Sequence, residues 1–566
     1  MESIEARILL KNFLKRVQPT GDGRLQILGT ITEDELEALR FALAALDPST
    51  PAVDIYVQSG TPQLIPEVIS SVVVPNSVEL DDEFVLDTTV LLLPAAKADV
   101  RLCFDFGTAM SKVTLVHDES SEREFEEIDV LKLGVPGDQE EIDEFMLVSS
   151  VYIDNAGLLW FGQMAVAKSQ IEGGDGGRQR LDNIKRYLSE EGLTSRVGQQ
   201  FNPTGIDITY ADMILAYLMY LTWAVTICVE ELGFPRNLGR RFAMPCFTGS
   251  KAREIVEQMH DMLEQSQLLA DTFTAEINSG LNLELFMQGV KAVRAEKHKT
   301  SLVAESITEP LGVAGSLISW KMPVNTLAMV IDVGAGTSDF SLFRLAFNPE
   351  SNKSIALEVA GSSRCITEAG NYLDKLLKGL ILREAGVNST HSHWLNIHGA
   401  LELNLRDLKE SLFRDQSLSV SLFDGRVVEI HLDAFLKLKQ VEDFGKSLAG
   451  TMREILEKVN FSFIEGAPNN TLALVFTGGG ADLPMVRSLS EGEIEIKNIT
   501  LNKVAAKGFP SWLSEQYPEL EDMYPRIAVS LGGARKKIIE HGGLAAVTAG
   551  DVKSTPKLDG YFVTGD

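Results

Sequence analysis

The sequence predicts an α/β protein in which two similar domains carry the same kind of hairpin. From Asp99 onward, short apolar runs that suit buried strands alternate with segments of helical periodicity. Two segments, 102–116 and 327–342, share one pattern: an apolar strand, an aspartate, small residues with a threonine, and a second apolar run. Since the two copies lie more than a domain length apart, the pattern indicates a duplicated domain.

The composition is that of a globular protein and argues against some classes of partner. The 566 residues carry a formal net charge of −28, so no basic excess is present for nonspecific nucleic-acid binding. The four cysteines, Cys103, Cys228, Cys246 and Cys365, lack the spacing of a disulfide framework or a zinc site. The N-terminus lacks the order of basic, apolar and small residues found in a signal peptide, so we expect a cytoplasmic protein.

Residues 1–98 are expected to form a separate small α/β domain of unknown role. Arg24–Thr30 and Glu83–Leu93 have the composition of strands, and Thr32 followed by Glu35 has the spacing of a helix capping box. No catalytic pattern occurs in this stretch of sequence. Its acidic clusters are expected to be solvated, with a docking face for a partner as the alternative.

The segment Met213–Val229 contains no charged residue and approaches the minimum length of a membrane span. It is short for that purpose, contains two threonines and two tyrosines, and is followed at once by Glu230 and Glu231. We therefore predict a helix that is buried on all sides, with membrane contact as the alternative.

The two hairpins have the residues expected of an anion site. The matching residues are Asp105, Gly107 and Thr108 in the first hairpin, and Asp332, Gly334, Gly336 and Thr337 in the second. Small residues let backbone N–H groups approach an anion such as phosphate closely. A plain glycine turn is the alternative for either hairpin alone. Two copies favour one ligand held between the domains, and because two acids would repel an anion, Mg²⁺ is expected with it.

Two charged positions outside the hairpins have ordinary explanations when taken alone. Lys185 lies in Leu181–Leu188, a segment with helical periodicity, where a lysine is usually solvated. Glu309 precedes Pro310, which can begin a helix, and a carboxylate is favourable near a helix N-terminus.

Farther along the chain, Leu401–Phe413 is predicted to be a helix that carries Lys409, and Leu472–Phe476 a buried strand. Gly478 and Gly479 follow that strand in a corner suited to an anion or a ring. Neither GxxxxGK[ST] nor GxGxxG occurs, which argues against the two commonest nucleotide-binding folds. A cluster of three histidines lacks a carboxylate or cysteine at metal-ligand spacing, so we predict surface residues: His391, His393 and His398.

Five segments, in order, resemble the nucleotide-binding domain of DnaK-type heat-shock chaperones, within the actin and sugar-kinase superfamily. They are DFGTAMSKVTL, LDNIKRYL, ITEPLGVAGSL, IDVGAGTSDFSLF and VFTGGGADLPMV. The resemblance implies an actin-like two-lobed ATPase fold, with duplicated mixed-sheet domains, flanking helices and ATP bound between the lobes. The first lobe would span 99–325 and the second 326–540, followed by a C-terminal tail, 541–566.

The resemblance also implies roles for individual residues. Asp105 and Asp332 would hold hydrated Mg²⁺, while Lys185, Glu309 and Thr337 would position the attacking water. The remaining residues would contact phosphate or nucleoside: Gly107, Thr108, Lys112, Gly334, Gly336, Lys409, Gly478 and Gly479. Phosphoryl transfer depends mainly on such positioning and on charge stabilisation.

Several positions depart from the family pattern. Ala109 replaces a hydroxyl residue of the first loop, and Ala335 replaces a glycine of the second. Asp482 stands where chaperones have an arginine that packs on adenine, and Glu410 stands where they have a second basic residue. The sequence therefore supports the contacts to phosphate better than it supports the contacts to the nucleotide base. The segment after 534 is too short for a β-sandwich peptide-binding domain, so we do not expect one here.

The sequence thus predicts a slow, Mg²⁺-dependent ATPase that binds ATP and ADP and acts as a chaperone-like, heat-shock-related switch on a protein partner. The partner would sense lobe closure directly or through residues 1–98. Two alternatives stay open: a nucleotide-binding adaptor with little hydrolysis, and an actin-like filament-forming ATPase suggested by Lys112. Neither nucleic acid nor a membrane is an expected partner.

Overall fold

The computed structural model describes residues 84–118, 126–134, 144–189, 192–246, 251–296, 302–318, 323–348 and 353–535, and two short strands nearer the N-terminus. The chain divides into two compact units, Met1–Asp81 and Asp82–Asp566. In the first unit, β1 (Val17–Pro19) pairs antiparallel with β2 (Leu25–Ile27), which falls within the predicted strand at 24–30. The helix predicted after Thr32 lies outside the described residues. The following description concerns the second unit.

The first large sheet has the strand order β5-β4-β3-β10-β12. Strands β3, β4 and β5 form an antiparallel meander, and β10 and β12 extend it in parallel from the side of β3. The strands are β3 (Val100–Asp105), β4 (Met110–His117), β5 (Glu127–Val130), β10 (Gly239–Met244) and β12 (Val303–Thr308), with β6 (Leu147–Val148) paired to β4.

The second large sheet has the order β15-β14-β13-β19-β21-β20. Strands β13, β14 and β15 again form an antiparallel meander, and β19 and β21 extend it in parallel from the side of β13. The strands are β13 (Val324–Val333), β14 (Ser338–Asn348), β15 (Lys353–Glu358), β19 (Thr471–Thr477), β20 (Glu493–Ile496) and β21 (Ile499–Ala505), with β16 (Arg364–Ile366) paired to β14.

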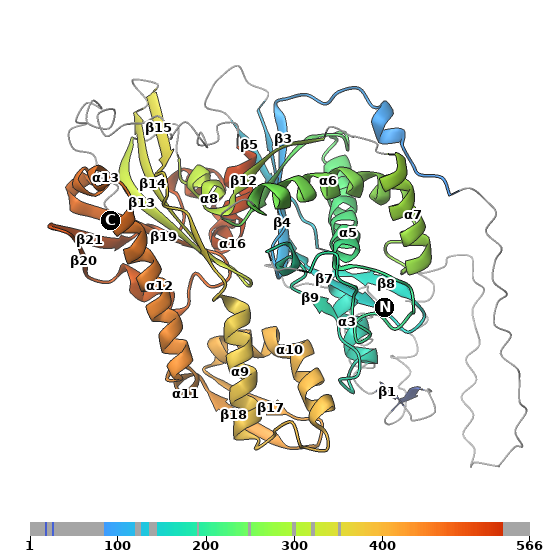
Figure 1. Ribbon diagram of the computed structural model, residues 1–566. Helices are drawn as coiled ribbons and strands as arrows, with labels where there is room; N and C mark the ends of the chain where they lie inside the picture. Colours follow the sequence, from blue (N-terminus) through green and yellow to red (C-terminus); the bar gives the residue numbers. More distant parts are fainter. Residues whose placement is uncertain are drawn as a thin grey trace, which may run out of the picture. The chain divides into compact units, whose positions relative to one another are not determined.

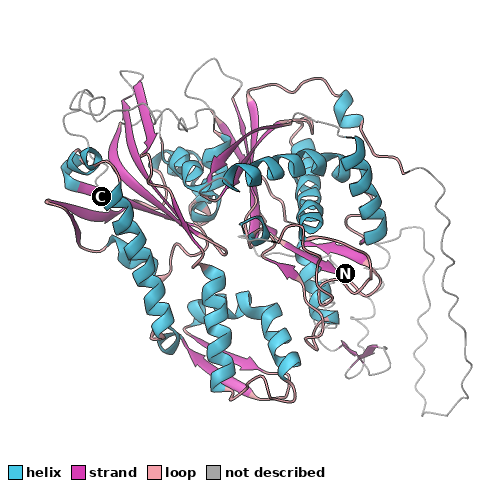
Figure 2. Ribbon diagram, in the orientation of Figure 1, coloured by secondary structure: helices cyan, strands magenta, loops and turns pink. Residues whose placement is uncertain are grey.

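The two sheets therefore repeat one topology, a three-strand meander extended by two parallel strands beside its first strand. Helices flank both sheets (Figure 2). The predicted α/β class with two mixed sheets is confirmed, and the repeated topology indicates duplicated domains. We call the first sheet with residues 84–308 the first lobe, and the second sheet with residues 324–520 the second lobe.

Helices α8 (Glu309–Leu317) and α16 (Tyr524–Ala534) pack together between the two sheets (Figure 1). Glycines permit this close contact. A Cβ added to Gly312 would lie 2.5 Å from the carbonyl oxygen of Val529, and one added to Gly532 would lie 1.8 Å from the carbonyl oxygen of Gly312. The helix backbones thus touch directly, which no larger residue at these positions would permit.

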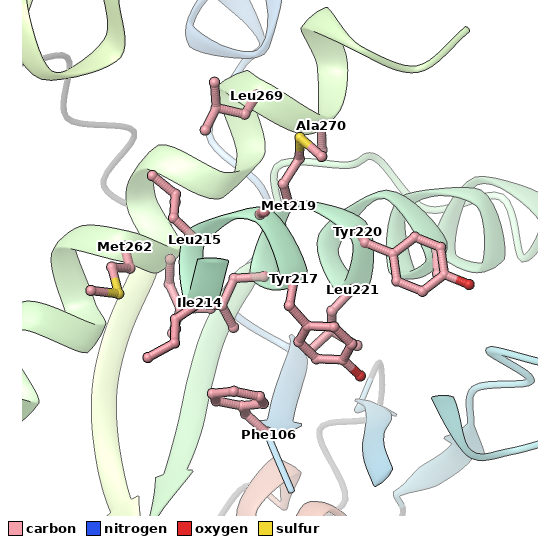
Figure 3. Packing of buried hydrophobic residues seen from close by; sticks show 14 of the residues in the cluster. Phe106, Ile214, Leu215, Tyr217, Met219, Tyr220, Leu221, Met262, Leu269 and Ala270 are labelled. Carbon is pink, nitrogen blue, oxygen red and sulfur yellow. The ribbon is translucent and has the colours of Figure 1, made fainter. Parts of the chain in front are cut away.

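The predicted buried helix is α5 (Tyr210–Glu231), which begins at a capping box formed by Thr209 and Asp212. By length and composition alone it could cross a membrane, but 78% of its most apolar window is buried inside the protein, as expected of a core helix. Figure 3 shows its apolar side chains between Phe106 on one side and Met262, Leu269 and Ala270 of the following long helix on the other. The ring of Tyr217 stacks on Phe106 with 5.5 Å between centroids, so α5 supports the loop that follows β3.

Smaller elements complete the two lobes. The first lobe contains a four-stranded sheet of β7 (Ser150–Ile153), β8 (Leu158–Phe161), β9 (Leu181–Asp182) and β11 (Leu281–Asn282), and helices η1 (Thr89–Leu92), α3 (Gly162–Glu172), α4 (Arg186–Ser189), α6 (Lys251–Thr272) and α7 (Leu283–Glu296). The second lobe contains a hairpin of β17 (Ser417–Ser421) and β18 (Val427–His431), and helices α9 (Gly370–Glu384), α10 (Trp394–Asp415), α11 (Leu432–Leu436), α12 (Lys439–Lys458), α13 (Phe461–Glu465), η3 (Pro468–Asn470), α14 (Pro484–Arg487), η4 (Ser488–Ser490), α15 (Ser511–Gln516) and η5 (Pro518–Leu520).

Two element predictions are wrong. In the strand predicted at Glu83–Leu93, the described residues 84–93 form a loop that enters η1, because the side chain of Asp87 accepts the N–H of Thr89 and starts a turn. The helix predicted at Leu181–Leu188 is instead β9 followed by the short α4. Leu181 joins a strand pair, and Asn183 adopts φ 57°, a left-handed conformation that a helix cannot contain.

The lobes also meet away from the sheets, where the loop after α3 contacts α10. A Cβ added to Gly399 would lie 2.3 Å from the carbonyl oxygen of Gly176. The side-chain amide of Asn396 donates to the carbonyl oxygen of Asp175 at 2.5 Å, and Arg180 donates to the carbonyl oxygen of Leu403 at 3.1 Å. We call this the interlobe glycine contact, after Gly176 and Gly399.

Candidate functional site

Two hairpin loops, one from each large sheet, meet at the candidate site. Asp105 is the last residue of β3, and Asp332 is the last residue but one of β13. Each strand runs straight into its loop. A Cβ added to Gly336 in the second loop would lie 2.8 Å from Thr108 Oγ1 in the first. The predicted pair of hairpins therefore faces one common site.

Both loops depend on small residues. A Cβ on Gly107 would lie 2.0 Å from the carbonyl oxygen of Met110, so the first loop requires glycine there. In the second loop, the N–H of Gly334 donates to the carbonyl oxygen of Thr337 at 2.9 Å and closes the turn. The loop residues are partly exposed, whereas the two strand ends beneath them are buried. A ligand can therefore reach the loop backbone.

Beneath the loops lies a buried ion pair between Lys185 and Glu309. The Lys185 Nζ and Glu309 Oε1 atoms are 2.6 Å apart, and the side chains are 5% and 8% exposed. Asn183 turns the chain ahead of Lys185, and Glu309 is the first residue of α8. The Lys185 Nζ atom also lies 5.8 Å from the ring centroid of Phe106, next to the first loop. Neither residue has the solvated position that it would have on an ordinary surface helix.

Acidic neighbours keep Lys185 charged despite its burial. Burial by itself would lower the pKa of Lys185, but Glu309, Asp105 and Asp339 together raise that pKa above its ordinary value. The ammonium group is therefore present at neutral pH. It is a fixed positive charge among carboxylates from both sheets.

The acids themselves hold protons unusually tightly. Burial raises the pKa of Asp332 to about 8, and the negative charges of Glu309, Asp339 and Asp105 add to this, while a hydrogen bond from Thr477 opposes it. Burial and Glu309 raise the pKa of Asp339 to about 7, against the opposing backbone N–H of Cys246. The site therefore has more negative charge than its own cations neutralise.

Both predicted phosphate lysines have acidic partners. Lys112 Nζ lies 3.3 Å from Asp105 Oδ2. Lys409 Nζ lies 2.8 Å from Asp374 Oδ1 and 3.3 Å from the carbonyl oxygen of Gly370. The N–H of Gly370 in turn donates to the carbonyl oxygen of Gly334, so Lys409 is linked to the second loop through the start of α9.

The predicted nucleoside corner packs directly against the end of β13. Gly478 has φ 82°, and a Cβ there would lie 2.4 Å from the carbonyl oxygen of Val333. Gly480 donates its N–H to the same oxygen at 2.9 Å. A Cβ on Gly479 would meet nothing within 4 Å, so that residue faces open space. Asp482, at the position where the resemblance would place a base-stacking arginine, is exposed and paired with Arg487.

Direct metal coordination by a cluster of side chains is not found in the part of the chain that the structure describes. No group of three or more His, Cys, Asp or Glu residues there could hold an ion, and this includes the three neighbouring histidines. The donors do fit a hydrated cation, which contacts few carboxylates directly. Asp105 and Asp332 lie at the ends of β3 and β13, one in each large sheet, and the charge of Asp105 acts on Asp332. Asp339 Oδ2 is buried without a hydrogen-bond partner.

The structure brings most of the predicted site residues together: Asp105, Gly107, Thr108, Lys112, Lys185, Glu309, Asp332, Gly334, Gly336, Thr337 and Gly478. Gly479 and Lys409 lie next to this group. Two residues of the site, Asp339 and Thr477, were not predicted. Both are β-sheet partners of Asp332, on β14 and β19. Only the strand register could have revealed them.

Comparison of the chain with protein-family models and with curated proteins found no match.

Proposed function

We propose that the second unit is a Mg²⁺-dependent ATPase of the actin and heat-shock ATPase superfamily, which acts as a slow conformational switch on a protein partner. The observation that carries this proposal is the buried pair of Lys185 and Glu309 beneath two apposed glycine hairpins. A buried lysine beside an anion site supplies charge stabilisation for phosphoryl transfer. The repeated sheet topology supports the actin-like fold.

The position of each residue in the site suggests its role in the proposed reaction. The loop backbones at 107–109 and 334–337 would bind the phosphates through N–H groups, which their small residues leave accessible. Asp105 and Asp332 would hold the hydrated cation, which supplies neutralisation of phosphate charge. Lys185 would stabilise the negative charge that develops on the transferred phosphoryl group, and Thr337 with Glu309 would orient the attacking water.

Lobe closure would link this chemistry to a partner. Asp105 and Asp332 lie on different sheets, so a nucleotide held by both hairpins favours the arrangement in which the lobes meet. Hydrolysis would remove the γ-phosphate and with it some of the contacts that join the two hairpins. A protein partner, or residues 1–98, would bind differently to the resulting arrangement of the lobes.

Turnover and binding by the purified chain test this proposal. We expect slow hydrolysis of ATP that requires Mg²⁺ and falls at least about 100-fold in Lys185→Met and in Asp332→Asn. Lys132→Ala, a change at a lysine whose side chain is 64% exposed in the same lobe, is the matched control and should retain turnover. Turnover that persists in the two site variants would refute the catalytic assignment.

Calorimetric titration with ATP, ADP and GTP, with and without Mg²⁺, tests the ligand separately. Tight binding without turnover in the unmodified protein would identify the adaptor described above. Binding of neither ATP nor ADP would refute the proposed function as a whole.

A further inference from the structure

The hydroxyl group of Thr477 forms a direct link between the nucleoside corner and the acid at the end of β13. Thr477 is the last residue of β19, and its side chain is completely buried. β19 runs parallel to β13 with Thr477 and Asp332 as register partners. The Thr477 hydroxyl donates to Asp332 Oδ1 at 2.9 Å.

The same oxygen of Asp332 is enclosed from a second side. A Cβ on Gly478 would lie 2.7 Å from Asp332 Oδ1, so the glycine backbone packs against this atom. The Gly478 N–H donates to the carbonyl oxygen of Pro525 at 2.8 Å, which fixes the loop to the start of α16. Oδ1 is therefore enclosed by the Thr477 hydroxyl group and the Gly478 backbone, which leaves Oδ2 as the oxygen more accessible to a further ligand.

The loop that would contact the nucleoside is thus joined to β13 at two adjacent residues. Thr477 bonds Asp332, and Gly480 donates its N–H to the carbonyl oxygen of Val333. These two hydrogen bonds link the orientation of the Asp332 carboxylate to the position of the 477–480 loop. This connection runs through hydrogen bonds of buried groups, which are stiffer than contacts of exposed side chains.

We propose that Thr477 is a positioning residue for cation binding, which orients the Asp332 carboxylate and couples the cation position to the nucleoside corner. This inference rests on the proposed function. Thr477 does not reach the reacting atoms, so it acts only through Asp332. A hydrogen bond to a charged group is worth enough to change an equilibrium by about tenfold or more.

The test uses the full chain and measures binding, without reliance on turnover. Thr477→Val removes the hydroxyl group with little change of shape and suits a strand, whereas Thr477→Ser keeps the hydroxyl group. ADP is titrated calorimetrically in EDTA and at a series of Mg²⁺ concentrations. Mg²⁺ is expected to increase the affinity for ADP, and the measured quantity is the Mg²⁺ concentration that gives half of the maximal increase.

We expect Thr477→Val to raise this concentration about tenfold, to leave ADP affinity in EDTA unchanged, and to match the unmodified protein in thermal unfolding within a few degrees. Thr477→Ser should restore the value to within about twofold. A double variant with Asp332→Asn should show no additional effect of Thr477→Val, because the group that it positions has already lost its charge.

Any of the following results would overturn the proposal that Thr477 positions Asp332 for cation binding. An unchanged Mg²⁺ dependence in Thr477→Val, or a serine variant that behaves like the valine variant, shows that the hydroxyl group does not position the cation. Equal loss of ADP affinity in EDTA shows a general structural role. If the unmodified protein binds ADP equally well with and without Mg²⁺, the proposed cation site is refuted but nucleotide binding is not. If it binds no nucleotide, the proposed function is refuted as well.

Discussion

Replacement of Asp332 by asparagine should stabilise the metal-free and nucleotide-free protein at pH 8. In the folded protein, burial and then the charges of Glu309, Asp339 and Asp105 raise the pKa of Asp332 from 3.8 to about 8. An acid whose pKa is raised by folding destabilises the fold when it is ionised. The loss of folding stability caused by Asp332 is therefore absent below about pH 4, grows as the pH rises, and reaches its full value above about pH 8.

The size of the effect follows from this pKa. One pKa unit is about 1.4 kcal/mol, so the rise from 3.8 to about 8 corresponds to roughly 6 kcal/mol at high pH. Asparagine removes the charge and retains an amide oxygen that can accept from Thr477. Burial of the amide itself costs about 1–3 kcal/mol. The expected gain in the free energy of unfolding is therefore about 3–5 kcal/mol at pH 8.

Urea denaturation in EDTA at pH 8, 6 and 4.5 measures this gain directly. The gain should shrink steadily as the pH falls, because ionisation of this aspartate in the unfolded chain, which favours unfolding, becomes less favourable as the pH approaches 3.8. Asp261→Asn makes the same change at a side chain that is 75% exposed, and it should alter stability by no more than about 0.5 kcal/mol at any pH. An Asp332→Asn protein that is no more stable than the unmodified protein at pH 8, or equally stabilised at pH 4.5, would refute the reasoning.

Two further predictions concern stability. Lys185→Met leaves Glu309 buried without its cation and should lower the free energy of unfolding by about 3–5 kcal/mol in the same denaturation assay. The added change Glu309→Leu should restore most of this stability. A single variant as stable as the unmodified protein would contradict the prediction. Gly379→Ala in α9, where a Cβ meets nothing, should stabilise by up to about 1 kcal/mol, whereas Gly399→Ala in α10 should destabilise because its Cβ would lie 2.3 Å from the oxygen of Gly176. Equal melting temperatures of the two glycine variants would show that the interlobe glycine contact does not form.

The hairpins could be predicted because their chemistry is local. An apolar strand, an acid and a few small residues follow one another within a short segment, so Asp105 and Asp332 were visible without any knowledge of the fold. The repetition of this pattern predicted two similar sheets, and their common topology confirms it. Apolar composition similarly predicted α5 as a core helix.

Contacts between distant segments could not be predicted in the same way. Asp339 and Thr477 join the site only because β14 and β19 pair with β13 in particular registers. The helix expected at 181–188 failed because Leu181 is held in a strand pair, a tertiary contact that overrides local periodicity. The interlobe glycine contact was equally hidden, since Gly176 and Gly399 are both ordinary glycines until the fold places them together.

On the proposed function, the charge of the site would also link ligand binding to movement of the lobes. Asp105 belongs to the first sheet, and Asp332 and Asp339 belong to the second, so their repulsion acts across the boundary between the lobes. Asp332 and Asp339 pair within the second sheet, so of these repulsions only those with Asp105 require the lobes to be together. On the proposed function, a ligand that neutralises the acids would remove that part of the repulsion. Such a ligand would bind the closed arrangement more tightly than an open one, which is the differential affinity that the proposed switch requires. The charge that should make Asp332→Asn more stable than the unmodified protein would, on the proposed function, be the charge that couples nucleotide to closure.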